Sequence, residues 1–199
     1  MADIRPLVMV DPSLLERLIT AGYTSTEAYQ VAREETPDRI RFELRLIRLN
    51  QPVVKRYPLD AQMIARYTEL AATGHAFGAF VDEACVGIAL CEPHAWNASL
   101  FIHEFRIAPD FQRMGIGRAL MAAVEEHARA EGMRRVVLET QTTNVPAIRF
   151  YRALGFTLDA VDISLYSNDD LARGEVAVFM KKSVSSASAN DTSILHRDE

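Results

Sequence analysis

The sequence has no long hydrophobic run and no clustered metal ligands, and both absences limit what the protein can be. No stretch reaches the roughly 18 apolar residues that a membrane-spanning helix needs. Residues 1–6 lack the basic segment that precedes the apolar core of a secretory signal. None of the five histidines lies at metal-ligand spacing from a cysteine or carboxylate. We therefore expect a cytoplasmic protein with no bound metal and no membrane partner.

Cysteine is scarce, and basic residues are outnumbered by acidic ones. The two cysteines, Cys85 and Cys91, fall in one expected strand, where six residues at about 3.3 Å each separate them by roughly 20 Å and exclude a disulfide between them. A net charge of −5 argues against general binding of nucleic acid, which usually needs a basic face. The acidic balance slightly favours a cationic substrate.

The length and composition suit one folded domain. The chain has 199 residues and 49% hydrophobic content, which is normal for a globular protein. We divide it into an N-terminal helical segment over 1–40, a domain over 41–182, and a small, polar tail over 183–199 that we expect to be disordered.

Hydrophobic periodicity predicts a mixed α/β order in the domain: strand, helix, three strands, helix, strand, helix, two strands. The fourth strand, 100–107, and the fifth, 135–140, are joined through a helix and should therefore run parallel. The expected strands cover 41–49, 76–81, 85–91, 100–107, 135–140, 156–165 and 175–180, and the expected helices cover 12–19, 24–35, 58–70, 117–131 and 144–155.

The most informative motif is Gln-Arg-Met-Gly-Ile-Gly over residues 112–117, between the strand ending at Ile107 and the next helix. Glycines let the backbone approach a ligand closely, and the unpaired N–H groups of a helix N-terminus favour an anion such as a pyrophosphate. The same glycines would also serve a tight turn without any ligand. The spacing matches neither the nucleotide P-loop nor the G-x-G-x-x-G dinucleotide loop.

This motif resembles the acetyl-coenzyme A loop of the GCN5-related N-acetyltransferases (GNAT). In that family the pattern Q/R-x-x-G-x-G/A follows a strand that ends in an aliphatic residue and a proline. Further family features follow in the same order: a strand over 136–140, Asn144, Phe150-Tyr151 and Gly155-Phe156. The resemblance covers about residues 40 to 181. It is closest to the streptothricin (nourseothricin) acetyltransferases, through Trp96-Asn97, residues 138–141, Val161-Asp162 and Leu165-Tyr166.

The resemblance implies a mostly antiparallel sheet in which the fourth and fifth strands splay apart, with acetyl-coenzyme A in the split. By analogy, the backbone of Phe105, Arg106 and Ile107 would bind the pantetheine arm and the thioester carbonyl, and Asn144 would both cap a helix and touch the cofactor. The pyrophosphate would be held by Gln112, Arg113, Met114, Gly115, Ile116, Gly117 and Arg118.

Tyr151 occupies the family position of the general acid that protonates the coenzyme A thiolate; the alternative is a packed aromatic beside Phe150. Glu104 would bind the acceptor ammonium or receive its proton, and a partly desolvated site would raise the pKa of its carboxyl. The alternative for Glu104 is a salt bridge with Arg106 or Arg135. Further acceptor-site candidates are the acids Glu139 and Asp162 and the aromatics Trp96 and Tyr166.

The resemblance therefore implies an enzyme that moves an acetyl group directly from acetyl-coenzyme A to a primary amine of a small cation. Streptothricin is the first candidate, with antibiotic resistance as the consequence. Alternative acceptors are a protein lysine, an N-terminus or a polyamine, and an alternative of another class is an acyl-coenzyme A sensor without catalysis. Exposed β-edges commonly pair subunits in this family, so a homodimer is among the arrangements that the resemblance allows.

Overall fold

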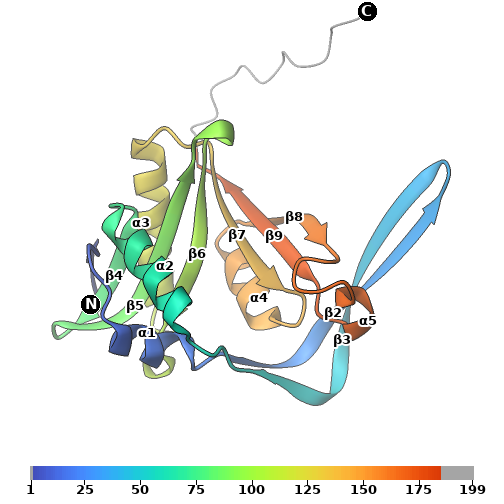
Figure 1. Cartoon of the computed structure of the whole chain (residues 1–199), viewed down its shortest axis with the longest axis horizontal. Coiled ribbons are helices and arrows are strands. Elements are labelled where there is room, and N and C mark those ends of the chain that lie inside the picture. Colours follow the sequence, from blue (N-terminus) through green and yellow to red (C-terminus); the bar gives the residue numbers. More distant parts are fainter. Residues whose placement is uncertain (1, 185–199) are drawn as a thin grey trace, which may run out of the picture.

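A mixed seven-stranded sheet forms the body of the protein (Figure 1). The computed structural model describes residues 2–184, so the expected tail lies outside the described residues from 185 onward. The sheet order is β1-β4-β5-β6-β7-β9-β8, and β2 and β3 form a separate two-stranded ribbon. The strands are β1 (Asp3–Pro6), β2 (Tyr23–Thr36), β3 (Arg39–Lys55), β4 (Ala76–Val81), β5 (Ala84–His94), β6 (Ser99–Ile107), β7 (Arg135–Gln141), β8 (Thr157–Asp162) and β9 (Ala177–Ser183).

Helices cover both faces of this sheet. They are α1 (Pro12–Ile19), α2 (Ala61–Ala72), α3 (Ile116–Ala130), α4 (Val145–Ala153) and α5 (Asp170–Arg173). On one face, α3 and α4 bury Leu120, Val124 and Ile148 against the strands, and on the other, α1 and α2 bury Leu18 and Leu70. Within residues 2–184, no helix is long and apolar enough to cross a membrane.

The predicted parallel pair is confirmed as β6 and β7, whereas all other neighbours in the sheet are antiparallel. Pairing joins Ser99–Ile102 to Arg135–Leu138 and then stops, although both strands continue. The two strands therefore separate at their carboxyl ends, as the resemblance implies. This separation positions the site.

The prediction of a helix over 24–35 is wrong, because these residues form β2. They pair with β3 from Tyr23↔Lys55 to Thr36↔Arg39. Residues 24–35 mix helix formers with threonine and valine, so local preference is weak and long-range pairing decides the conformation. The strand predicted over 41–49 is part of the longer β3, and the ribbon projects away from the sheet (Figure 1).

Gly87 in β5 allows β6 to lie close, and it provides a test of the packing under the site. A Cβ atom at Gly87 would lie 2.5 Å from Ile107 Cδ1 and 3.0 Å from the backbone oxygen of Arg106. We expect Gly87→Ala to lower the free energy of unfolding by about 1–3 kcal/mol in urea denaturation.

Gly78→Ala in β4 is the matched control, because the Cβ atom there would meet only side-chain ends, of Phe80 and Leu7. Gly78→Ala should therefore lower the free energy of unfolding by less than Gly87→Ala does. Equal losses for the two variants would show that the β5–β6 contact is not the tighter one.

Candidate active site

A cavity of about 230 Å³ opens where β6 and β7 separate. Both strands contribute side chains to it, α4 closes one side, and residues around α1 and α2 close the other. It is therefore built by segments that lie far apart in the sequence. The lining residues are Ile19, Tyr57, Met63, Tyr67, Ile102, His103, Glu104, Phe105, Arg106, Leu138, Glu139, Thr140, Gln141, Asn144, Ala147 and Tyr151.

An irregularity in β6 aims Glu104 at this cavity. The register with β5 shifts between Leu90↔Glu104 and Cys91↔Ile102, so His103 is an extra residue in the ladder. Regular alternation would put His103 and Glu104 on opposite faces of the sheet. Instead, Glu104 accepts a hydrogen bond from Tyr67 on α2, and His103 contacts Glu92 on β5, to which Arg66 of α2 also donates.

The Glu104 carboxylate is buried and already paired. Arg106 Nε lies 2.6 Å from Glu104 Oε1, and the Tyr67 hydroxyl donates to Oε2 at 3.0 Å. The Arg106 contact is an ion pair without a linear hydrogen bond, because the Nε–H is not directed at the carboxylate. Burial disfavours the guanidinium, but Glu104 and Tyr57 outweigh burial and raise the pKa of Arg106. The salt bridge that the sequence allowed as an alternative for Glu104 is therefore present.

Glu139 lies across the split from this pair. Among the described residues that line the cavity, it is the carboxylate with no cationic partner, and it accepts a hydrogen bond from the Tyr166 hydroxyl. Burial raises the pKa of Glu139; the bond from Tyr166 opposes this, and the charges of Glu104 and Glu175 add to it. A carboxyl with a raised pKa and room in front of it can accept a proton.

Tyr151 reaches the cavity from α4. Its ring packs against Phe105, Phe150 and Phe156, and the residue is 8% exposed. Its hydroxyl has no hydrogen-bond partner among the described residues. Burial raises the pKa of Tyr151, although Arg106 opposes the shift, so the phenol stays protonated.

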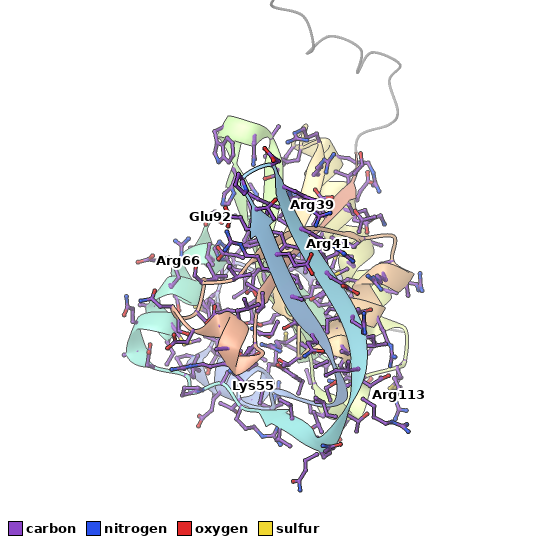
Figure 2. All side chains as sticks on the ribbon, turned by 90° about the vertical axis from the view of Figure 1, so that its right-hand side faces the viewer. Arg39, Arg41, Lys55, Arg66, Glu92 and Arg113 are labelled. Carbon is purple, nitrogen blue, oxygen red and sulfur yellow. The ribbon has the colours of Figure 1, made fainter. Side chains whose placement is uncertain are left out.

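The loop before α3 has the features of an anion site. Gly115 precedes the helix with φ +82°, and no side chain caps the first turn, so its N–H groups stay available. Gly117 lets the helix approach α4, because a Cβ atom there would lie 3.1 Å from Phe150. Arg113 points away from the body (Figure 2), and neither Arg113 nor Arg118 has an ion-pair partner within residues 2–184. These residues fit a pyrophosphate.

Asn144 caps a helix, as the sequence predicts, and it also lines the cavity. Its side-chain oxygen accepts a hydrogen bond from Ala147 N at 3.3 Å and so caps α4. A proline at the start of the same helix, Pro146, fits a first turn that needs no N–H donor.

A protein-family model described as "Acetyltransferase (GNAT) family" matches residues 31–156. The chain belongs to the GNAT acetyltransferases. It is 35% identical over 170 residues to the streptothricin acetyltransferase of Streptomyces lavendulae. This alignment covers 81% of this chain and 85% of that protein. The crystal structure of nourseothricin acetyltransferase aligns with a TM-score of 0.70 at 29% identity, over 92% of this chain and 99% of that one.

A further solved structure with the GNAT fold contains a bound acetyl group donor. It comes from Bacillus anthracis str. Ames, was solved in complex with acetyl coenzyme A, and has a TM-score of 0.67 at 19% identity over 92% of this chain and 97% of that one. At this identity the likeness concerns the fold alone.

Two residues predicted for the acceptor site of this acetyltransferase lie elsewhere. Trp96 is 86% exposed in a turn before β6, at the opposite end of that strand from the cavity. Asp162 accepts a hydrogen bond from Ser164 N at 3.0 Å and stabilises the turn after β8. Neither lines the cavity. Tyr166 reaches the site indirectly, through its bond to Glu139.

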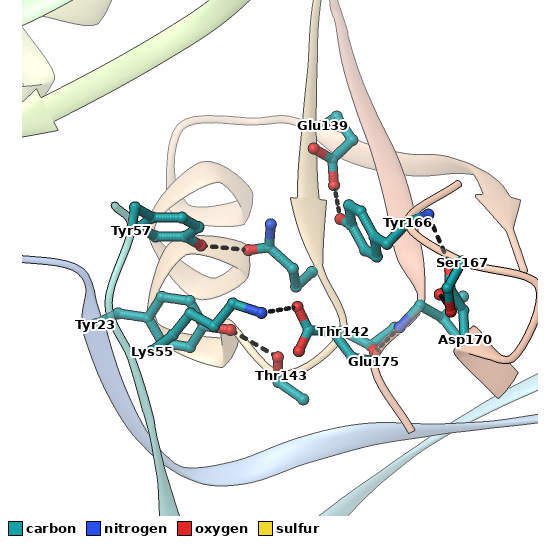
Figure 3. A network of polar contacts seen from close by, with 12 residues as sticks. Tyr23, Lys55, Tyr57, Glu139, Thr142, Thr143, Tyr166, Ser167, Asp170 and Glu175 are labelled. Carbon is teal, nitrogen blue, oxygen red and sulfur yellow. Dashed lines mark hydrogen bonds and ion pairs between the residues drawn. The ribbon is translucent and has the colours of Figure 1, made fainter. Parts of the chain in front are cut away.

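The ribbon and α2 bring tyrosines to the GNAT split that no pattern in the sequence predicts. Tyr57 donates to Gln141 Oε1 at 2.9 Å. The Tyr23 hydroxyl is bonded to that of Thr143 at 2.6 Å (Figure 3). Lys55 beside them pairs with Glu175 at 2.6 Å. No local pattern marks Tyr57 or Tyr67 as a site residue, because their partners lie 84 and 37 residues away.

The buried Glu104–Arg106 pair can be tested by removing one partner or both. Arg106→Met leaves a buried carboxylate without its cation and should lower the free energy of unfolding by about 3–5 kcal/mol. The double variant Glu104→Leu/Arg106→Met should recover most of that loss in urea denaturation.

Arg45→Met is the control, since its ion pair with Glu43 on β3 is exposed and its loss should cost no more than about 1 kcal/mol. If the double variant were as unstable as Arg106→Met alone, an uncompensated charge would not be the cause.

Proposed function

We propose that this protein transfers the acetyl group of acetyl-coenzyme A directly to a primary amine of streptothricin. The observation that carries the proposal is the 35% identity to a streptothricin acetyltransferase over 81% of the chain. The cavity supports it, because a phenol and a carboxyl without a cationic partner face the split of a GNAT sheet. Acetylation removes one positive charge, which would weaken binding of the antibiotic to anionic RNA and so confer resistance.

Residues 112–118 and the first turn of α3 would hold the pyrophosphate of acetyl-coenzyme A. The backbone of Phe105, Arg106 and Ile107, at the free edge of β6, would hold the pantetheine arm, and Asn144 would touch the cofactor from α4. When bound, the cofactor supplies an acetyl thioester. The role of this chain is to keep the thioester in the split and to exclude water from it.

The acceptor amine must lose a proton before it can attack. A lysine-like amine with a pKa near 10.4 is about 3.4 units from neutrality at pH 7, a cost of roughly 4.6 kcal/mol. Glu104 and Glu139 are the candidate bases. Arg106 and Tyr67 already contact the two carboxylate oxygens of Glu104, whereas Glu139 has no cationic partner among the described residues that line the cavity. Glu139 is the carboxyl that we assign to receive the proton.

Tyr151 would act on the leaving thiolate. An ordinary phenol has a pKa of about 10 and a thiol about 8.5, and burial raises the pKa of Tyr151 further. The phenol therefore remains protonated at every working pH and can donate a hydrogen bond as negative charge develops on sulfur. Its hydroxyl is free for this role among the described residues.

An assay of the purified protein with acetyl-coenzyme A and three acceptors tests the proposal. We expect rapid release of coenzyme A with streptothricin and much slower release with spermidine or a lysine peptide. Faster turnover of spermidine or the peptide would assign a polyamine or protein acceptor instead. Binding of acetyl-coenzyme A without turnover of any acceptor would favour a sensor without catalysis.

The roles of Glu139 and Glu104 can be distinguished by the pH dependence of kcat/KM in variants of each residue. We expect Glu139→Gln to lower kcat/KM by about 10²-fold near neutral pH and by less at high pH, where the free amine is abundant. The contrast arises because a base is needed only while the amine is protonated. Glu104→Gln should lower kcat/KM to a similar extent at all pH values. The reverse pattern would make Glu104 the base.

Tyr151→Phe tests the hydrogen bond to the thiolate. We expect kcat to fall by about 10²-fold, while KM for acetyl-coenzyme A changes little, because the phenol acts on the leaving group in the transition state. Phe150→Leu, a neighbour without a hydroxyl, is the control for packing. Unchanged kcat in Tyr151→Phe would remove this role from Tyr151.

A further inference from the structure

A buried carboxylate, Asp170, takes no part in the chemistry of the proposed acetyl transfer. It begins α5, in the segment of residues 163–176 that joins β8 to β9, and it is 2% exposed. It has no ion-pair partner within residues 2–184. A buried charge without a cation is costly unless hydrogen bonds satisfy it, so the bonds of Asp170 show which part of the chain it holds.

The donors to Asp170 come from its own segment. Tyr166 N donates to Oδ2 at 2.8 Å, and Ser167 Oγ donates to Oδ1 at 2.7 Å, so each carboxylate oxygen has a donor. Burial opposes ionisation of Asp170, but the bonds from Ser167 and from the backbone of Tyr166 outweigh burial and lower its pKa. The carboxylate is therefore charged at neutral pH, and it holds the backbone of residues 166–167 in place.

The side chain of Tyr166 extends from this fixed backbone to the cavity. Its hydroxyl donates to Oε1 of Glu139, which lines the cavity from β7 (Figure 3). Burial and the neighbouring Glu139 raise the pKa of Tyr166, so the phenol remains protonated and remains a donor. Asp170 and Glu139 are thus connected through the two ends of one tyrosine.

The far end of the same segment is attached to β7. Glu175 N donates to the backbone oxygen of Asp170 at 3.2 Å. Val176 N donates to Thr142 Oγ1 at 3.0 Å, directly after β7. These bonds fix α5 relative to that strand. Asp170 therefore connects a fixed part of the segment to Tyr166.

The bond from Tyr166 leaves one oxygen of Glu139 available to a ligand. Oε1 accepts from the tyrosine hydroxyl, and no donor within residues 2–184 contacts Oε2. Tyr166 thereby determines which oxygen the acceptor amine meets. This matters for the reaction, because a general base must lie within hydrogen-bond reach of the proton that it takes.

We propose that Asp170 is a positioning residue for acetyl transfer, which acts through Tyr166 to hold the Glu139 carboxyl in the orientation that receives the acceptor proton. This rests on the proposed function, in which Glu139 is the base. Tyr166 is 41% exposed, so water competes for its hydroxyl. A backbone already fixed by Asp170 lowers the conformational entropy that the bond to Glu139 costs.

The pKa of Glu139, measured without substrate from its carboxyl-carbon resonance in NMR, tests this coupling. Glu139→Gln assigns the resonance. The bond from Tyr166 lowers the pKa of Glu139, so we expect that pKa to rise in Tyr166→Phe and to rise by less in Asp170→Asn. Loss of the Asp170 charge alone would lower the pKa of Glu139. A rise in Asp170→Asn therefore reports the weakened contact with Tyr166.

The other charges around Glu139 are the same in all these variants. Glu104 on β6 and Glu175 after α5 both raise its pKa, and each keeps its cationic partner, Arg106 or Lys55. A change in the pKa of Glu139 is therefore not caused by a change in these pairs.

Asp169→Asn is the matched control. It removes the same charge from the neighbouring position, where the side chain is exposed and makes no capping hydrogen bond. We expect it to leave the pKa of Glu139 unchanged. A rise as large as that in Asp170→Asn would show that the effect comes from the segment as a whole and would overturn the role of Asp170.

Kinetics with the acceptor give a second readout. We expect Tyr166→Phe to lower kcat/KM for the acceptor about tenfold and Asp170→Asn to lower it by less, with KM for acetyl-coenzyme A unchanged in both. If Asp170 acts through Tyr166, the double variant Tyr166→Phe/Asp170→Asn should be no slower than Tyr166→Phe alone. Losses that multiply in the double variant would overturn the proposal.

An unchanged pKa of Glu139 in Asp170→Asn would also overturn it, and would leave acetyl transfer untouched. A rise in that pKa in a parent that acetylates no amine would instead contradict the proposed function. Should Asp170→Asn fail to fold, Ser167→Ala takes its place, because it removes the donor to Oδ1 and keeps the charge. The pKa of Glu139 should rise there too, and an unchanged value would overturn the proposal.

Discussion

The short ladder between β6 and β7 is the constraint on which the site depends. Four residues of each strand pair, and then the strands separate, so the backbone of 103–107 and 139–141 lacks a strand partner on the facing edges. Buried backbone groups need hydrogen-bond partners. The split is therefore a place where an extended ligand can complete a sheet, and it is filled from both sides by side chains that carry chemistry.

The charges around the split are arranged so that a cation is the natural ligand. Glu104 is paired with Arg106, and Glu175 is paired with Lys55. Glu139 has only the neutral hydroxyl of Tyr166 as a partner among the described residues, and burial holds its pKa above the ordinary range. Three tyrosines, Tyr57, Tyr67 and Tyr151, also line the cavity. A pocket with a free carboxyl among phenols suits an ammonium on a polar molecule, in agreement with the acceptor that we propose.

Local signals in the sequence predict the turn at 112–117 and the cap at Asn144, because each depends on neighbours in the chain. The position of Tyr151 at the split was implied only by the resemblance to the family. The ribbon was missed, since β2 is defined by pairing with β3 rather than by its own pattern. The extra residue at His103, which turns Glu104 toward α2, leaves no mark in the sequence. Tyr57 and Tyr67 enter the cavity only through the fold, and Trp96, which the resemblance suggested, lies at the far end of β6.

Calorimetric titration with acetyl-coenzyme A is the most direct test of the account, because the split and the loop before α3 are assigned to that ligand. The account predicts saturable binding of one molecule per chain, with an affinity that falls as salt is raised and that is weaker in Arg113→Gln. Absence of saturable binding to the folded parent protein would contradict the assignment of the site.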